Sequence, residues 1–95
     1  LTGITIPESI TEISDRMFLH CRNLTSFITP NGVTRIGKEA FERCESLTDI
    51  FIPRSVTRFG ANAFKGCRKG LTIHAPAGSV AEQFAQKVGI AFQPM

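Results

Sequence analysis

The sequence predicts an α/β solenoid in which coils of 23 residues stack on one another, with a parallel sheet on one face and a C-terminal helical cap. Three similar units follow one another, over residues 1–23, 24–46 and 47–70, and a different segment follows over 71–95. The units align in four columns: Leu1, Leu24 and Leu47; Pro7, Pro30 and Pro53; Phe18, Phe41 and Phe64; Cys21, Cys44 and Cys67. A fixed period in the twenties is typical of solenoids, because one coil cannot bury its apolar side alone. We expect one domain over residues 1–95.

Each unit is predicted to begin with a short strand that ends at a proline. In the first unit, Ile4 and Ile6 share one face through the two-residue alternation of a strand, and Pro7 ends the strand because it has no N–H for the ladder. The matching inward pairs are Phe27 with Thr29 and Ile50 with Ile52. Thr29 stands where the other units have isoleucine, so we expect it to loosen its coil slightly. A second extended piece follows in each unit, over 10–13, 33–36 and 56–59.

A helical turn in each unit is predicted to carry the phenylalanine column into the interior. It follows Ser14, Gly37 or Gly60 and delivers an apolar pair to the core: Met17 and Phe18, Ala40 and Phe41, or Ala63 and Phe64. The phenylalanines are then expected to form a stacked aromatic spine.

The cysteine column is predicted to hold buried free thiols. Cysteines one coil apart lie within the Cα separation that a disulfide tolerates, so geometry leaves a bond open, but three stacked thiols cannot all pair. A metal site built from Cys21, Cys44, Cys67 and His20 lacks a paired-ligand spacing such as C-x-x-C. We expect no metal.

The C-terminal segment is predicted to be a lid over the end of the core. A fourth strand over 71–75 leads to Ser79 and Glu82, which form a capping box at the start of a helix. The apolar stripe of that helix consists of Ala81, Phe84, Ala85 and Val88. Gly89 is placed to end the helix, and residues 90–92 are expected to add a last short strand.

Composition and charge argue against disordered, membrane-spanning and nucleic-acid-binding classes. Hydrophobic residues make up 42% and charged residues 20%, as in folded soluble domains, and no apolar run approaches the roughly 20 residues of a membrane helix. The net charge is +3, yet most charges are expected to face an opposite charge on the next coil. The expected pairs are Glu12 with Arg35, Asp15 with Lys38, Arg16 with Glu39, and Glu42 with Lys65, which leaves Arg35 beside Arg58 and Arg68 beside Lys69 unbalanced. A continuous basic face with stacking aromatics, as nucleic acid requires, is missing.

The sequence contains no catalytic signature, so we expect a chain that is not an enzyme and needs no cofactor. His20 and His74 fall in different columns, without a nearby carboxylate at consistent spacing. Neither G-x-x-x-x-G-K nor G-x-S-x-G occurs.

The outward face of the sheet is the candidate ligand-binding site. Its outward column is Thr5, Ile28, Phe51 and His74, and the column beside it, Gly3, Ser26, Asp49 and Thr72, would form a polar rim. Exposed apolar patches often mark contact sites, so a protein-binding face is one interpretation. The other is that Ile28 and Phe51 are ordinary strand formers that the surface tolerates, or that the lid or a neighbouring molecule covers them.

The repeated unit, L-x-x-I-x-I-P-x-S-[IV]-T-x-I-x-x-x-x-F-x-x-C, resembles the BspA-like leucine-rich repeats of bacterial and protozoan surface proteins. The resemblance covers the whole chain and implies a leucine-rich-repeat solenoid, export to the cell surface, and adhesion to host matrix proteins or to other cells. A passive spacer within a longer surface solenoid is the alternative. Ordinary leucine-rich repeats carry Asn or Cys where this chain has Ser9, Gly32 and Ser55, so no asparagine ladder is expected.

The N-terminal end has no lid of its own in the sequence. The chain opens on Leu1 inside a unit, and we interpret it as part of something longer. We expect the apolar residues of the first unit to be about half exposed to solvent; they are Ile4, Ile6, Ile10, Ile13, Met17 and Phe18. Either further chain precedes them, or the protein self-associates through this uncapped end.

Overall fold

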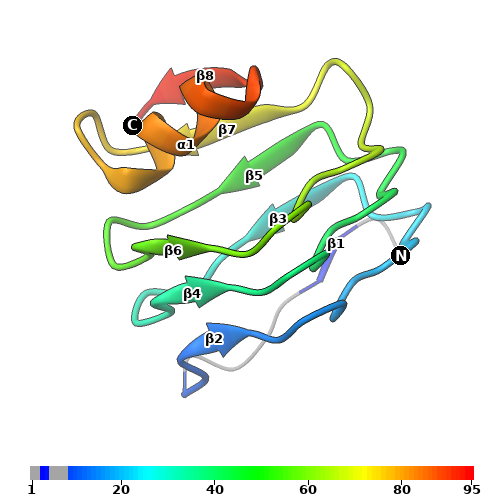
Figure 1. Ribbon diagram of the computed structural model, residues 1–95, viewed down its shortest axis with the longest axis horizontal. Coiled ribbons are helices and arrows are strands. Elements are labelled where there is room, and N and C mark those ends of the chain that lie inside the picture. Colours follow the sequence, from blue (N-terminus) through cyan, green and yellow to red (C-terminus); the bar gives the residue numbers. More distant parts are fainter. Residues whose placement is uncertain (1–2, 5–8) are drawn as a thin grey trace.

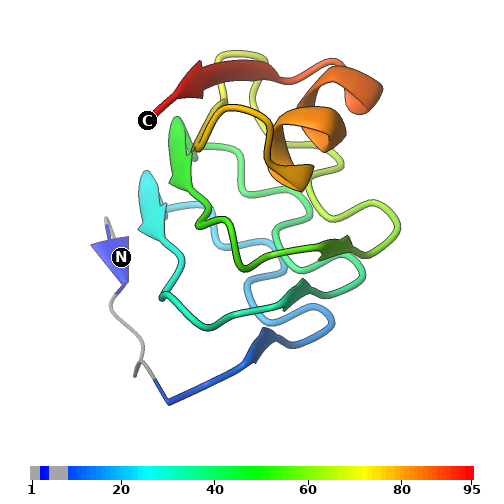
Figure 2. The same ribbon diagram turned by 90° about the vertical axis from the view of Figure 1, so that its left-hand side faces the viewer.

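The computed structural model describes residues 3–4, by their backbone, and residues 9–95, in which two parallel sheets and one helix form (Figure 1). The larger sheet has the strand order β1 (Gly3–Ile4), β3 (Ser26–Ile28), β5 (Asp49–Phe51), β7 (Thr72–Ala75) and β8 (Ala91–Pro94). The smaller sheet has the order β2 (Glu12–Ile13), β4 (Arg35–Ile36) and β6 (Arg58–Phe59). The coils pile on one another, and α1 (Val80–Val88) lies at the C-terminal end of the pile (Figure 2). This is the α/β architecture that the sequence predicts.

Neighbouring strands pair at a constant offset, which aligns like residues across the larger sheet. Ser26 pairs with Asp49, and Asp49 pairs with Thr72, each 23 residues further along the chain. The offset changes only at the last pair, where Thr72 of β7 lies beside Ala91 of β8. Here α1 replaces a coil as the crossover between two parallel strands. The expected last strand is therefore present.

The phenylalanine column forms the predicted aromatic spine. The ring centroids of Phe18 and Phe41 are 5.2 Å apart, those of Phe41 and Phe64 are 5.3 Å apart, and both pairs are stacked. Phe27, from β3, tilts against the first two rings at 5.0 and 5.3 Å. Phe41 is fully buried, and the apolar residues of β3, β5 and β7 pack around the spine.

The segments that carry these phenylalanines are not helical turns, so this expectation was wrong. They are runs of tight turns in which every fourth residue or so adopts the left-handed conformation. The residues with φ between 57° and 60° are Arg16, His20, Glu39, Arg43 and Asn62. A right-handed helix would direct its N–H groups to carbonyls of the same segment. Here every second N–H instead donates to the next coil, as from Phe18 N to Ala40 O at 2.8 Å, which joins the coils outside the sheets.

The first coil is better buried than expected. Ile13 is fully buried and Phe18 is only 6% exposed, because both point into the pile and pack with the residues of the second coil. Ile10 is partly buried, whereas Met17 is 41% exposed and does not enter the core as predicted. The side chain of Ile4, together with Leu1, Ile6 and Pro7, lies outside the described residues.

The coils approach each other closely at two glycines. A Cβ added to Gly37 would lie 2.5 Å from the backbone nitrogen of Asp15, and one added to Gly60 would lie 2.3 Å from that of Lys38. Real Cβ atoms essentially never come so close to backbone. The close stacking of the turns therefore depends on hydrogen in place of a side chain at these positions.

The three cysteines are free thiols, as expected, although only Cys44 is fully buried. The Sγ atoms of Cys44 and Cys67 donate to the carbonyls of Phe18 and Phe41, each at 3.1 Å. Burial raises the pKa of the Cys44 thiol to about 12 and that of Cys67 to about 11. Both thiols therefore act as protonated, space-filling donors between coils.

The cap largely follows the prediction. Ser79 Oγ accepts from the Glu82 N–H at 3.3 Å, and Glu82 Oε1 accepts from the Gly78 N–H at 2.6 Å, so the box reaches one residue further upstream than usual. Gly89 ends α1 with a left-handed φ of 79°. The apolar stripe is only partly buried, because Val88 is 48% exposed beside a hollow and does not lie on the core.

Two of the four expected ion pairs between coils are present. Arg35 binds Glu12 and Arg16 binds Glu39, at 2.7 and 2.6 Å. Asp15 instead binds Arg35 at 2.7 Å and accepts from the Lys38 backbone N–H at 2.8 Å. Within the described residues, Glu42 and Lys65 form no ion pair. Arg22 and Glu45 form an unexpected one, with 3.9 Å between Arg22 Nε and Glu45 Oε1.

Candidate functional site

The outward column of the larger sheet brings Ile28, Phe51 and His74 side by side. They occupy paired positions on β3, β5 and β7, while the preceding residue of each strand points into the core. Ile28 is 68% exposed. The ring of Phe51 lies flat on the imidazole of His74, with centroids 4.4 Å apart and an angle of 17° between the planes. Thr5, the fourth predicted member, lies outside the described residues.

The polar column beside it is tied to the outward column by Asp49. Asp49 Oδ1 lies 2.8 Å from His74 Nε2, and Asp49 Oδ2 accepts from the Thr48 hydroxyl at 2.8 Å. The pKa of the Asp49 carboxyl is lowered, first by the hydrogen bond with His74 and then by that from Thr48. Ser26 and Thr72 stand in register with Asp49 on either side.

The cluster of Thr48, Asp49 and His74 is suited to fixing the conformation of these surface side chains. The Thr48 hydroxyl contacts the carboxylate and not the imidazole, so His74 is not placed to take a proton from it. A hydroxyl nucleophile needs its base within hydrogen-bonding reach. Among residues 9–95, no three His, Cys, Asp or Glu side chains are grouped to bind a metal ion.

A shallow hollow of about 340 Å³ adjoins the outward column at the carboxyl ends of the strands. Its walls are mainly apolar, and its lining residues are Ile28, Thr29, Asn31, Phe51, Pro53, Arg54, Pro76 and Met95. Met95 reaches it because its N–H donates to the carbonyl of Ala75 at 3.0 Å, which holds the end of the chain against β7. The hollow beside Ile28 and Phe51 is therefore suited to an apolar side chain of a ligand.

A family profile described as a BspA-type leucine-rich repeat region of six copies matches residues 1–83. The chain belongs to the BspA-type leucine-rich repeat family. A crystal structure of a leucine-rich repeat protein from T. pallidum is similar to this BspA-type chain, with a TM-score of 0.68 and 31% sequence identity. The similarity covers 73% of the BspA-type chain and 32% of the T. pallidum chain, so the chain spans about a third of that protein's length. Among curated protein sequences, none matches significantly.

In the described part of the BspA-type chain, side-chain hydroxyl groups form hydrogen bonds from one coil to the next. Ser55 Oγ donates to the carbonyl of Val33 at 2.8 Å, and Thr34 Oγ1 donates to that of Thr11 at 3.2 Å. In the described part of the chain, no helix is long and apolar enough to cross a membrane.

Some residues of this surface of the BspA-type chain were predictable from the sequence, and others were not. The structure brings together the predicted Ile28, Phe51, His74, Ser26 and Asp49. It adds Thr48, Pro53, Pro76 and Met95, which were not predicted as site residues. The proline column was visible in the sequence and could have indicated the walls of the hollow. The place of Met95 had no sequence signal, because it depends on how α1 returns the chain to the sheet.

Proposed function

We propose that this chain is a non-catalytic protein-binding module, folded as one domain over residues 1–95, that binds through the outward face of its larger sheet. Family membership supports the general role, because leucine-rich repeats commonly mediate protein interactions. The observation that carries the choice of face is Ile28, which is 68% exposed beside Phe51 and an apolar hollow.

The chemistry of this face suits a partner with an apolar side chain flanked by polar groups. The exposed surface of Ile28 and Phe51 would bury that side chain, while Asp49 and Arg54 at the margins could bind its polar neighbours. Because the contact with Phe51 and Asp49 holds His74 in one orientation, little side-chain freedom would be lost on binding. We propose that the partner is an extracellular matrix protein or another cell-surface protein, and that the module works outside the cell.

Replacement of Ile28 by Ser tests the face. Burial of one such side chain contributes about 1.5–3 kcal/mol, and about 1.4 kcal/mol corresponds to a tenfold change in affinity. We expect Ile28→Ser to weaken binding at least tenfold and Ile28→Ser combined with Phe51→Ser to abolish it, measured by biolayer interferometry against purified matrix proteins. Leu19→Ser is the matched control, because Leu19 is also exposed, at 38%, but lies on a turn of the first coil. Unchanged binding by the double variant would refute the site.

The alternative function is a passive spacer within a longer surface solenoid. It is supported by the ion pairs of Arg16 with Glu39 and of Arg35 with Glu12 and Asp15, which join neighbouring coils. A spacer has no saturable partner. If the unaltered chain binds no protein of the panel saturably, while its circular dichroism spectrum shows a folded protein, the spacer is favoured over the binding module.

A further inference from the structure

The turns outside the sheets form a second ladder of hydrogen bonds between coils. In the first coil, three alternate N–H groups donate to the second coil: Arg16 to Lys38 O at 2.9 Å, Phe18 to Ala40 O at 2.8 Å, and His20 to Glu42 O at 2.8 Å. The second coil repeats the pattern with the third: Glu39 to Ala61 O at 3.0 Å, Phe41 to Ala63 O at 2.8 Å, and Arg43 to Lys65 O at 2.7 Å. Each coil therefore presents a row of donors toward the C-terminal end of the pile.

The equivalent donors of the third coil belong to Asn62, Phe64 and Gly66. Asn62 and Gly66 have φ values of 60° and 77°, so the turn keeps the conformation of the earlier coils. In the described residues, no protein group accepts a hydrogen bond from these three N–H groups. The carbonyls of Ala63 and Lys65, which lie between these N–H groups, already accept from the second coil. The three N–H groups therefore point toward the C-terminal end of the stack. A further coil would lie there, and α1 lies there instead. Buried amides are rarely left without a partner, and Phe64 is only 7% exposed.

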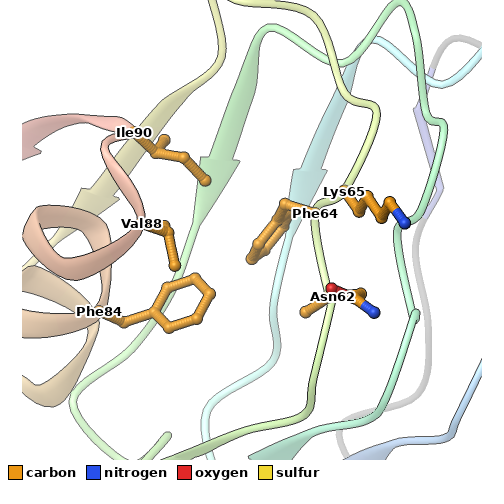
Figure 3. A pocket seen from close by; sticks show the side chains of 7 residues that line it. Asn62, Phe64, Lys65, Phe84, Val88 and Ile90 are labelled. Atoms are coloured by element: carbon orange, nitrogen blue, oxygen red, sulfur yellow. The ribbon is translucent and has the colours of Figure 1, made fainter.

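A pocket of about 250 Å³ borders this row of donors. Its lining residues are Asn62, Ala63, Phe64, Lys65, Phe84, Val88 and Ile90. The ring of Phe64 faces Phe84, Val88 and Ile90 across the pocket, while the side chains of Asn62 and Lys65 extend away from α1 (Figure 3). The pocket therefore combines apolar side chains, one of them the half-exposed Val88, with the backbone edge of the third coil.

We infer that this edge is a second protein-docking site, separate from the sheet face, which accepts a peptide segment of a partner protein. The partner would present main-chain carbonyls at alternate residues to the N–H groups of Asn62, Phe64 and Gly66, and one apolar side chain to the pocket. The contacts between coils indicate that the ligand is a peptide, because in both earlier coils the same row of donors binds alternate carbonyls of a peptide chain. A row of three donors along a chain matches a backbone better than it matches a single small anion.

The first test follows the amide signals of the whole chain by ¹⁵N–¹H NMR. The probe is a synthetic peptide with the sequence of residues 37–45 and serine in place of Cys44. Within the protein, alternate carbonyls of this turn accept hydrogen bonds from the row of donors of the first coil. We expect saturable shifts of the Asn62, Phe64 and Gly66 amides, and slower hydrogen exchange there on binding. Shifts confined to other residues, or none that saturate at millimolar peptide, would overturn the proposal.

The second test changes the pocket without changing the core. Val88→Glu places a charge in the apolar wall and should weaken peptide binding at least tenfold. Gln86→Glu is the control, because it adds the same charge to an exposed position of α1 that does not line the pocket, and its binding should be unchanged. Val88→Ala keeps the helix neutral and should weaken binding by a smaller factor. Equal affinity of the Val88→Glu and Gln86→Glu variants, with both folded by circular dichroism, would contradict the site.

Discussion

Thr29 is the buried residue of the described chain whose side-chain hydroxyl has no hydrogen-bond partner. It is 3% exposed and, directly after β3, occupies the inward position that Ile52 and Ala75 fill further along the chain. A buried hydroxyl that lacks a partner costs about 1–3 kcal/mol. We therefore expect Thr29→Val to raise the free energy of unfolding by about 1 kcal/mol, measured by urea denaturation.

Thr48→Val provides the opposite case for comparison. Its hydroxyl lies 3.0 Å from the carbonyl of Thr25 and 2.8 Å from Asp49, so its loss removes bonds that are made. We expect this variant to be less stable than the unaltered chain. Equal effects of the two substitutions would contradict the assignment of Thr29 as an unsatisfied group.

The contact between Asp49 and His74 predicts a pH dependence at the sheet face. The hydrogen bond with His74 is the main cause that lowers the pKa of the Asp49 carboxyl from its ordinary value of 3.8. A group whose pKa is lowered by folding stabilises the folded state above its unfolded pKa, and this contribution is lost as the pH falls through the folded pKa.

We expect His74→Ala to raise the pKa of Asp49, as followed by the NMR signals of its side chain. The difference in stability between the unaltered chain and Asp49→Asn should be full above pH 3.8 and should disappear as the pH falls through the lowered pKa of the native carboxyl. A carboxyl pKa that stays the same in His74→Ala would show that the contact is not maintained in solution.

At the scale of the elements, the turns between strands limit which side chains are allowed. A Cβ on Gly37 would lie 2.5 Å from the Asp15 nitrogen, and the clash with backbone cannot be relieved by moving a flexible side chain. We expect Gly37→Ala to lower the free energy of unfolding by about 1–3 kcal/mol, the usual cost of overpacking.

Gly70→Ala is the matched control for this prediction. A Cβ there would meet only Arg68 Nε, at 3.6 Å, which is an ordinary contact with a mobile side chain. Thermal unfolding of both variants should show a clear loss for Gly37→Ala and little change for Gly70→Ala. Similar melting temperatures would indicate that the first two coils are not packed as closely as described.

The strands and the cap could be predicted from the sequence, whereas the turns could not. Alternation, the proline column and the Ser79–Glu82 box are local signals, and each led to an element that is present. Gly66 takes one of the left-handed positions in these turns, but the others are occupied by residues that are not glycine: Arg16, His20, Glu39, Arg43 and Asn62. These turns are joined to their neighbours by hydrogen bonds between coils, and no short-range pattern in the sequence indicates those bonds.

At the scale of the whole molecule, self-association through the first coil stays a prediction. Met17 is 41% exposed on that coil, and β2 is an edge strand of the smaller sheet. We expect sedimentation velocity to show a concentration-dependent increase in mass that Met17→Ser reduces. A single monomeric species at all concentrations would contradict the prediction.

The candidate binding face was predictable in part for the same reason as the strands. Once the 23-residue columns were aligned, Ile28, Phe51 and His74 had to stand side by side and face outward. The stacked contact between Phe51 and His74 depends on side-chain orientation, and the hollow that Met95 helps to line depends on the crossover through α1. These are consequences of long-range packing, which residue spacing does not encode.

The constant register of β3, β5 and β7 has a consequence for how such a chain can change its length. Excision of residues 24–46 would bring Asp49 opposite Gly3 and Ile50 opposite Ile4, the same columns that their counterparts occupy now. Loss of a single residue within a strand would instead shift the register of that strand and move its inward side chains to the solvent side. Duplications and deletions should therefore survive only as whole coils, so that the molecule grows or shortens by steps of one strand spacing, about 4.8 Å.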